Sequence, residues 1–317
     1  MALAVVRYES EGRTGWGVVH GERLMPVCSG SLSTGTFIQY VEAEHVPPFE
    51  EPAIPLAGSR ILSPITRDQQ FICLGANYRQ HMIESGIDPD VKRFNMVFTK
   101  APGSIAPFDS ELVKPRCVRF LDYEIELGLV IKKAITGKIT VTEESLGDYI
   151  AGVVMLNDYS ARDIQIPQGQ FYKGKSFRTF APIGPYLCLL QRNEMHYLRD
   201  LQLILTVNGE VRQKDCSANL VFGPAETLTE LSSVHDLAPG DLIATGTPAG
   251  CALTVPRPLK QRLFALLPER KKWELFLKIQ ARRTQYLKPG DVVESSIRSS
   301  DKRIDLGVQH NLVVEEV

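Results

Sequence analysis

The sequence has little of several features that mark specialised classes of protein. It has no excess of charge, because 36 Lys and Arg residues stand against 37 Asp and Glu residues in a chain of 317. We therefore expect no basic surface that binds nucleic acid. No run of about 18 apolar residues occurs, and the opening MALAVVRYESEG lacks the basic segment and apolar core of a signal peptide. We expect a cytoplasmic protein with no membrane partner.

The six cysteines are too scattered to form a recognisable framework. None belongs to a C-x-x-C pair and none stands beside a patterned histidine. We therefore expect neither a zinc site nor a disulfide scaffold. The chain does have ample apolar content, 44% of its residues, which is enough to bury a full core. These features favour a globular protein that acts on a small molecule.

Three short β-rich runs open the chain and predict a small N-terminal β domain. A proline-rich stretch from Pro47 to Pro64 follows, and its proline spacing predicts an ordered linker, because it blocks a regular helix or a central strand. We place the boundary near residue 68, which divides the chain into 1–68 and 69–317. The three β-rich runs are residues 3–8, 15–19 and 24–27.

Beyond this boundary the signals are mostly β, and they predict a mostly β (α+β) fold with a large, mixed, barrel-like sheet. Asn208-Gly209 lies between two alternating runs and predicts a hairpin. Pro-Gly-Asp precedes an apolar run at 239–241 and again at 289–291, as a turn does. The expected strands lie within 120–133, 151–158, 201–214, 241–246 and 291–299.

Helical patterns are few. The last is an amphipathic insertion at about 256–286, whose apolar residues we expect to be buried against the body or a partner subunit. The other expected helices cover 78–85, 142–150 and 224–233.

Acidic residues alternate with apolar ones in the segment LDYEIELG. Asp122, Glu124 and Glu126 therefore share one face of an expected strand. An outward-facing acidic stripe explains this pattern, because charged residues usually lie at the surface. A bound cation also explains it, because it removes the repulsion between like charges. Glu124 and Glu126 side by side suit a hard cation such as Mg²⁺.

A third carboxylate ligand has to come from another strand. The apolar run GVVML is followed by Asn157 and Asp158, where a buried strand reaches a sheet edge and delivers polar groups to a site. An ordinary turn explains the same pair. The polar residues that follow include Arg162 and Gln165, and side chains of this kind suit a ligand that carries a carboxylate.

His81 and Glu84 lie three residues apart and share one face if their segment is helical. In such a pair the histidine acts as a base that deprotonates a water molecule, and the carboxylate orients the histidine. A surface ion pair is the alternative. Gly75 and Gly86 bracket the segment, which is typical of a lid that moves.

Two lysines and a glycine-rich turn complete the candidates. Lys100 in FTKAP and Lys175 in YKGKSF stand against apolar residues. A lysine in such a place stabilises a developing oxyanion, although most lysines are simply solvated. The turn GTPAG offers the Thr247 hydroxyl and backbone amides to a ligand, or is only a tight turn.

Five motifs in order resemble the fumarylacetoacetate hydrolase family. They are GANYxxHxxExG, DYEIELG, NDYSARDIQ, GKSFRTFAPIGP and GDLIATGTPAG, and the resemblance covers roughly residues 70–255 and 287–317. It implies a mixed β-roll around one Mg²⁺ or Mn²⁺ per subunit, usually in a homodimer with a variable N-terminal domain. It also implies that Glu124, Glu126 and Asp158 hold the metal, and that His81 and Glu84 form a water-activating dyad on a lid.

The resemblance implies roles for the remaining candidates. Lys175 would stabilise an enolate, and Gln165 would help to place the water. The residues implied or considered as substrate contacts are Arg162, Thr247, Tyr78 and Lys100.

The leading functional hypothesis is hydrolysis of a carbon–carbon bond in a 1,3-dioxo acid, such as an acylpyruvate or a fumarylpyruvate-like compound. Decarboxylation of an oxo acid such as oxaloacetate, or tautomerisation of a hydroxydienedioate, shares the same metal enolate. A metal-binding interaction protein that docks through the insertion is an alternative from another class. After GTPAG the sequence departs from the family pattern with an insertion of about thirty residues, and this leaves the substrate open.

Overall fold

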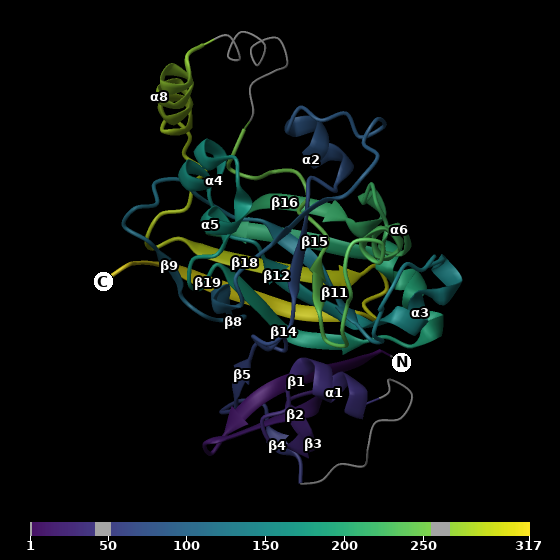
Figure 1. Ribbon diagram of the computed structural model, residues 1–317. Helices are drawn as coiled ribbons and strands as arrows, with labels where there is room; N and C mark the ends of the chain where they lie inside the picture. Colours follow the sequence, from purple (N-terminus) through teal and green to yellow (C-terminus); the bar gives the residue numbers. More distant parts are fainter. Residues whose placement is uncertain (1, 42–51, 255–266) are drawn as a thin grey trace.

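A computed structural model describes residues 2–41, 52–254 and 267–317 (Figure 1). Its largest element is a 12-stranded mixed sheet. The strands of this sheet are β1 (Leu3–Ser10), β2 (Arg13–His20), β3 (Arg23–Ser29), β4 (Ile54–Pro55), β5 (Arg60–Leu62), β6 (Phe71–Gly75), β7 (Met96–Thr99), β8 (Ile105–Pro107), β11 (Ile125–Ile131), β12 (Ile150–Asn157), β14 (Ala181–Leu189) and β17 (Leu242–Ala244).

The order of the strands is β4-β3-β2-β1-β14-β12-β11-β17-β6-β7, with β5 added on β1 and β8 on β14. Within the described residues no pairing joins β4 to β7, so the sheet is open and not a closed barrel. The predicted fold class, mostly β with a mixed sheet, is confirmed. Strands β11 and β12 are buried along their whole length, as expected for central strands covered on both faces.

A second sheet of five strands covers one face of the first. The two sheets share a hydrophobic core that joins Leu127 of β11 and Met155 of β12 to Leu203 and Ile297. The order of this sheet is β16-β15-β18-β19-β9. Its strands are β9 (Leu112–Lys114), β15 (Leu201–Val207), β16 (Glu210–Cys216), β18 (Val292–Ser299) and β19 (Asp305–Glu315).

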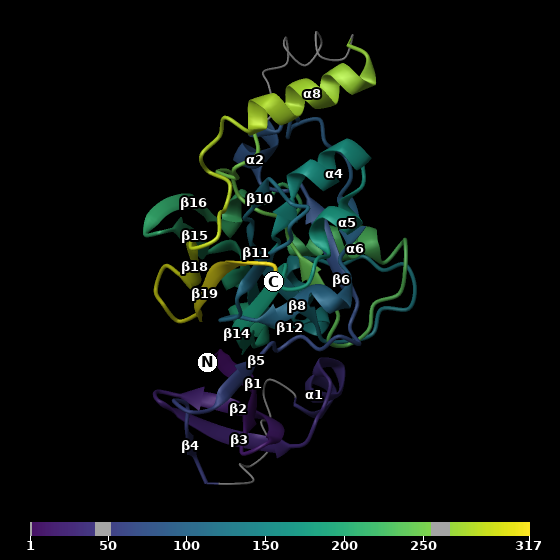
Figure 2. The ribbon, with the colours of Figure 1, turned by 90° about the vertical axis from the view of Figure 1, so that its left-hand side faces the viewer.

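The three strands predicted at the N-terminus are present as β1, β2 and β3. They lie with helix α1 (Thr34–Tyr40) at one end of the molecule (Figures 1 and 2). Trp16 stacks on Phe37 of α1 with ring centroids 4.1 Å apart. β1 pairs with β14 through Leu3 and Leu189, so hydrogen bonding of the sheet continues across the proposed boundary. The division at residue 68 stays a prediction.

The predicted turns are confirmed. Asn208 and Gly209 join β15 to β16, and both have positive φ angles, 52° and 79°, as a tight hairpin turn requires. Gly240 and Gly290, in the two Pro-Gly-Asp turns, have φ angles of 89° and 92°. Each turn is followed by a strand, β17 or β18.

The expected helices at 78–85, 142–150 and 224–233 are present in part or in full, whereas two helices between residues 162 and 175 were not predicted. No helix of the described chain is long and apolar enough to cross a membrane. The helices besides α1 are α2 (Arg79–Glu84), α3 (Leu146–Tyr149), α4 (Arg162–Gln168), α5 (Phe171–Lys175), α6 (Pro224–Leu231) and α8 (Glu269–Gln280). A small pair of strands, β10 (Leu121–Asp122) and β13 (Ser160–Ala161), precedes α4.

Helix α8 lies in the described part of the insertion and stands at the far end of the molecule from the N-terminal strands (Figure 2). Leu277 packs against the main core, as predicted for the apolar residues of this segment. Leu275 is 38% exposed in the single chain, so its burial against a partner subunit stays a prediction. Residues 256–266 of the predicted insertion lie outside the described residues.

Candidate active site

The three predicted metal ligands meet at the ends of two paired strands. Glu124 and Glu126 flank Ile125 at the start of β11, so their side chains lie on the same face. Ile125 pairs with Asn157 of β12, and the amide of Asp158 donates to the carbonyl of Glu124 at 2.8 Å. One ligand atom from each of the three carboxylates lies within 4.8 Å of the others, and all three residues are buried.

This set of donors fits a divalent cation. Hard cations such as Mg²⁺ prefer carboxylate oxygens, and Glu126 in particular has little to offset its charge. Within the described residues it accepts a hydrogen bond from the amide of Gly246 at 2.9 Å. Burial, with Asp158 and Glu124 nearby, raises the pKa of Glu126 well above its usual value. An outward acidic stripe is therefore excluded, and the cluster can hold a divalent metal.

Two buried, positively charged side chains bond the carboxylates. Lys175 Nζ donates to Glu124 Oε2 at 2.6 Å and also bonds Asp158. Arg162 bonds Glu124 and, through Nε, donates to Asp122 at 2.8 Å. Burial alone would raise the pKa of Glu124, but the charges of Arg162 and Lys175 hold this pKa well below its usual range. Glu124 is thus ionised, and its position is fixed from two sides.

Asp122 has a role that the sequence did not indicate. Its carboxylate accepts hydrogen bonds from the amides of Ala252 at 2.7 Å and Leu253 at 3.0 Å, in addition to the bond from Arg162. Asp122 therefore joins the segment after the GTPAG turn to the arginine that holds Glu124.

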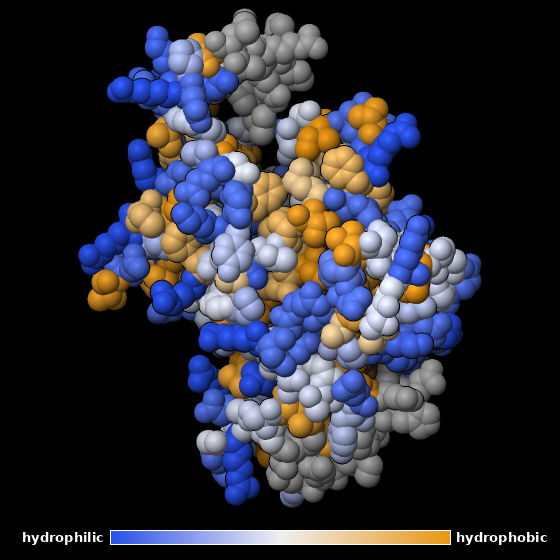
Figure 3. Space-filling model, in the orientation of Figure 1, coloured by the Kyte–Doolittle hydropathy of each residue, from blue (hydrophilic) through white to orange (hydrophobic). Residues whose placement is uncertain are grey.

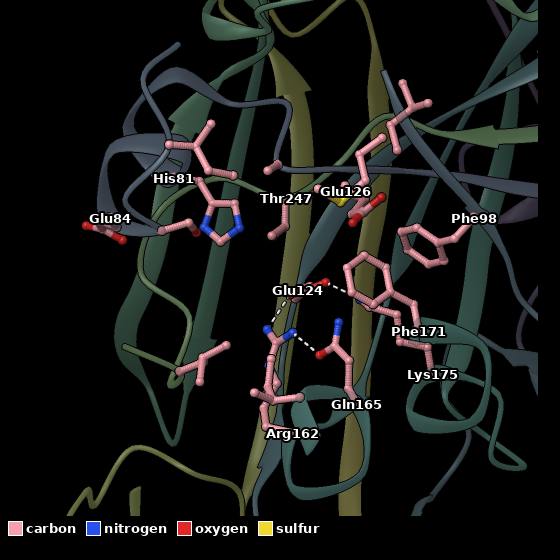
Figure 4. A pocket seen from close by; sticks show the side chains of 18 residues that line it. His81, Glu84, Phe98, Glu124, Glu126, Arg162, Gln165, Phe171, Lys175 and Thr247 are labelled. Carbon is pink, nitrogen blue, oxygen red and sulfur yellow. Dashed lines mark hydrogen bonds and ion pairs between the residues drawn. The ribbon is translucent and has the colours of Figure 1, made fainter. Parts of the chain in front are cut away.

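A pocket of about 190 Å³ opens over the carboxylate cluster (Figure 4). In the space-filling view, apolar residues gather in the middle of the face below α2 (Figure 3). The pocket brings together residues from β6, β7, β11, α2, α4 and α5. The predicted site residues in its lining are His81, Glu84, Glu124, Glu126, Arg162, Gln165, Lys175 and Thr247.

Two predicted substrate contacts do not line this pocket. Lys100 Nζ donates to Asp158 Oδ1 at 2.5 Å and to the carbonyl of Phe180 at 3.0 Å, so it neutralises a predicted ligand from within the protein. Tyr78 is fully buried in the core between the sheets. The structure therefore supports a structural position for both residues and does not bring either to the pocket.

His81 reaches the pocket because the chain turns sharply after β6. Ala76 has a φ of 49°, which is uncommon for a residue other than glycine. The Asn77 side chain then donates to the carbonyls of Thr245 at 3.0 Å and Phe222 at 3.1 Å, which anchors the start of α2. His81 Nδ1 is buried and has no hydrogen-bond partner among the described residues. Burial lowers the pKa of His81, so the imidazole is neutral at pH 7.

The predicted dyad of His81 and Glu84 is not formed in this conformation. Both residues line the pocket. The Glu84 carboxylate, however, lies on the side of the His81 ring that faces away from Glu124 and Glu126 (Figure 4). Glu84 accepts a hydrogen bond from the amide of Gly250 at 3.2 Å instead. The dyad therefore stays a prediction that requires the Glu84 side chain to change direction.

Thr247 lines the pocket, and its hydroxyl is used within the protein. Its Oγ1 donates to the carbonyl of Ile125 at 3.0 Å and accepts from Gln213 at 2.9 Å. These bonds hold the turn after β17 against the start of β11. The pocket also has an apolar side that sequence reasoning missed, formed in part by Met96, Phe98 and Phe171.

Comparison with known proteins identifies the family. Residues 70–314 match the model described as fumarylacetoacetate (FAA) hydrolase C-terminal. The chain is 36% identical over 198 residues to the oxaloacetate tautomerase YisK of Bacillus subtilis (strain 168), which covers 62% of this chain and 64% of that protein. The match thus spans less than two thirds of this relative's length.

Solved structures resemble the whole chain. A fumarylacetoacetate hydrolase from Exiguobacterium antarcticum has a TM-score of 0.74 and 28% identity, over 99% of this chain and 100% of that one. A 2-hydroxyhepta-2,4-diene-1,7-dioate isomerase from Mycobacterium marinum has a TM-score of 0.71 and 23% identity, over 99% of each chain, and shows likeness of fold. With its carboxylate cluster and pocket in the region that the family model matches, the chain belongs to the fumarylacetoacetate hydrolase family.

Proposed function

We propose that this protein is a divalent-metal-dependent enzyme that moves a proton on a small 2-oxo acid and so interconverts its keto and enol forms. The observation that carries this proposal is the Nδ1 of His81, which has no hydrogen-bond partner in the described part of the chain and lies in a pocket above three buried carboxylates. A neutral imidazole can take a proton from the carbon next to the oxo group, which leaves an enolate, and the enol forms when the enolate oxygen takes up a proton. The same two steps in reverse regenerate the keto form.

Glu124, Glu126 and Asp158 would hold one Mg²⁺ or Mn²⁺ per chain. When bound, such a cation acts as a Lewis acid and stabilises the negative charge of an enolate. Lys175 adds positive charge at the same place, since its ammonium lies between Glu124 and Asp158. Lys175 also holds these two carboxylates in position.

Two further points support proton transfer. The relative YisK, 36% identical to this chain, is named an oxaloacetate tautomerase. Proton transfer also needs only a base and a group that stabilises the enolate, whereas hydrolysis needs in addition a water molecule that the base activates for attack on the distal carbonyl. Glu84, the expected partner of that base, bonds Gly250 rather than His81.

The second candidate is hydrolysis of a carbon–carbon bond in an acylpyruvate, the leading hypothesis from the sequence. One observation favours it: Glu84 lines the same pocket as His81 and lies within one helical turn of it, so a side-chain rotation can pair them. His81 would then take a proton from water, the hydroxide would attack the distal carbonyl, and the enolate of pyruvate would leave. Lys175 would stabilise that enolate.

One experiment separates the two reactions. Oxaloacetate and 2,4-dioxopentanoate are incubated with the protein and Mg²⁺ or Mn²⁺, and the enol absorbance is followed together with the release of pyruvate from the dioxo acid. Tautomerisation changes the enol absorbance faster than in the protein-free control and releases no pyruvate. Pyruvate formed together with acetate establishes hydrolysis, and neither change with any 2-oxo acid contradicts both. A homodimer remains the expected assembly, which the mass of the protein in solution tests.

A further inference from the structure

We infer that the pocket selects a 2-oxo acid with a single carboxylate and an apolar distal group, such as an alkyl or aryl chain. This inference rests on the proposed function, because it assumes that the oxo-acid end lies at the carboxylate cluster. It concerns the opposite end of the substrate, which the proposed reaction leaves open.

The charged residues of the pocket are already committed to partners within the protein. Arg162 donates to Asp122, Glu124 and Gln165. Lys175 donates to Glu124 and to Asp158. These are the Arg and Lys residues among the described residues that line the pocket. The described lining therefore contains no free arginine or lysine for a second carboxylate.

The side of the pocket next to the carboxylate cluster is aromatic and apolar. Phe98 of β7 and Phe171 of α5 meet edge to face, with ring centroids 4.9 Å apart and an interplanar angle of 86°. Lys175 Nζ lies 5.2 Å from the centroid of the Phe98 ring, so this wall begins where the carboxylate cluster ends. Other apolar residues continue the lining, namely Leu74, Ile87, Met96, Ile166 and Leu253.

These two features decide which distal group fits. A second carboxylate against the Phe98 and Phe171 rings loses water without gaining a cation, which is unfavourable. An alkyl or aryl group removes apolar surface from water on both sides of the contact. Oxaloacetate and 2-hydroxyhepta-2,4-diene-1,7-dioate, named for two similar proteins, both carry two carboxylates. The pocket thus predicts a substrate that differs in charge from both.

Matched substrates test this inference. We would measure kcat/KM for the pair 2,4-dioxohexanoate and 2,4-dioxohexanedioate, which differ in the terminal group, whichever reaction consumes them. The monocarboxylate is expected to exceed the dicarboxylate by at least about tenfold, the cost of an unpaired buried charge. Lengthening the chain from 2,4-dioxopentanoate to 2,4-dioxoheptanoate is expected to raise kcat/KM by about fourfold per buried methylene. Equal values, or a preference for the dicarboxylate, would overturn the inference.

A variant in the wall locates the effect. Phe171→Ala is expected to lower kcat/KM for 2,4-dioxoheptanoate by about tenfold or more, while the binding of oxalate by the metal-loaded protein, measured by calorimetry, stays unchanged because oxalate has no distal group. Tyr172→Ala is the matched control, since Tyr172 follows on the same helix and is 45% exposed. Loss of oxalate binding together with activity would show a damaged fold. In that case Ile166→Lys replaces Phe171→Ala as the test variant. The added ammonium group is expected to raise kcat/KM for the dicarboxylate relative to that for the monocarboxylate.

The outcomes also separate this inference from the proposed function. If dioxo acids are converted but the dicarboxylate is preferred, the inference on the distal group fails and the proposed function stands. If no member of the series is converted, calorimetric binding of the same matched pair decides the charge preference. Failure of oxalate and of every oxo acid to bind the metal-loaded protein would contradict both.

Discussion

Arg162 fixes the direction in which the Gln165 side chain faces. Its Nη1 donates to Gln165 Oε1 at 2.8 Å (Figure 4). A guanidinium group has only donors, so the amide oxygen of Gln165 faces Arg162 and its NH₂ group is directed elsewhere. Gln165 lines the pocket, and we therefore expect this NH₂ group to donate to an oxygen of the substrate or of water.

Replacing this donor tests that role. Gln165→Glu keeps an acceptor for Arg162 but exchanges the NH₂ group for a carboxylate oxygen, which repels an anionic substrate. We expect KM for the 2-oxo acid to rise about 10-fold to 100-fold, the usual worth of a hydrogen bond to a charged group. Gln168→Glu is the control, because Gln168 is an exposed residue of the same helix. An unchanged KM in steady-state kinetics would remove Gln165 from the binding site.

Asp158→Asn tests the proposed metal site. The amide keeps the shape of the side chain but removes one of three anionic ligands, so we expect the affinity for Mn²⁺ to fall by at least about tenfold. Isothermal titration of Mn²⁺ into demetallated protein measures this affinity. The control is Asp148→Asn, at a side chain that is 46% exposed. Equal affinity in Asp158→Asn and wild type would exclude Asp158 as a ligand.

Lys175→Met separates charge stabilisation from metal binding. Lys175 bonds both Glu124 and Asp158, and its removal increases the repulsion between these carboxylates. We therefore expect affinity for Mn²⁺ to be kept or raised while kcat falls about 10²-fold to 10³-fold, as for the loss of a group that stabilises an oxyanion. Lys173→Met, at an exposed position of the same helix, should leave both unchanged. A variant with normal kcat would show that Lys175 is structural.

The His81 base is tested by truncation. His81→Ala is expected to lower kcat about 10²-fold to 10⁴-fold, the usual contribution of a general base, with little change in metal affinity. His196→Ala serves as a control at an exposed histidine. A wild-type rate in His81→Ala on the best substrate would exclude this base.

Glu84→Gln distinguishes the two candidate reactions. Glu84 bonds Gly250 and not His81 in the structure, so proton transfer by His81 alone should proceed at close to the wild-type rate. Hydrolysis through the dyad should lose part of its rate, because the imidazole loses its orienting carboxylate. The measured quantity is kcat for tautomerisation and for pyruvate release, each compared with the wild type. A large loss of tautomerisation would show that Glu84 takes part in proton transfer.

The pH dependence follows from the burial of His81. Burial lowers its pKa below the ordinary value of 6.5, so the imidazole stays neutral to a lower pH than a free histidine. With metal kept saturating, kcat/KM should therefore be constant above pH 6.5 and fall as the pH decreases through the lowered pKa. The inflection should disappear in the residual activity of His81→Ala. An inflection above 6.5, or one that persists in this variant, would assign the titration to another group.

The sequence predicted the parts of the site that depend on local spacing. Glu124 and Glu126 are two residues apart on a strand, which fixes them on one face whatever the fold. Asp158 was indicated by its place at the end of an apolar strand. The hairpin at Asn208 and Gly209 likewise depends on backbone preferences that these two residues carry themselves.

Features that depend on distant contacts were not predictable in the same way. Asp122 and Arg162 are forty residues apart in sequence, and nothing near either one indicates that they bond. Lys100 was predicted to contact the substrate because its neighbours in the sequence are apolar. Apolar neighbours indicate that a lysine is buried, but they do not indicate whether it faces the pocket or, as Lys100 does, bonds Asp158 inside the protein. The contact of Phe98 with Phe171 joins β7 to α5, so the apolar wall exists only in the folded chain.

Helix α4 was also missed, and its sequence explains why. It contains Pro167 and is followed by the C-cap residue Gly169, which has a φ of 59°. Proline and glycine both disfavour a helix. The helix forms where Asp163 accepts the amides of Arg119 at 2.8 Å and Phe120 at 3.3 Å, contacts with a distant segment that outweigh the local preference.

Metal dependence of turnover tests the central claim most directly. The protein is demetallated with a chelator, the conversion of a 2-oxo acid is measured, and Mg²⁺ or Mn²⁺ is then titrated back. Three buried carboxylates at one point predict that activity is lost and returns in full at one metal ion per chain. Undiminished conversion by thoroughly demetallated protein would contradict the account.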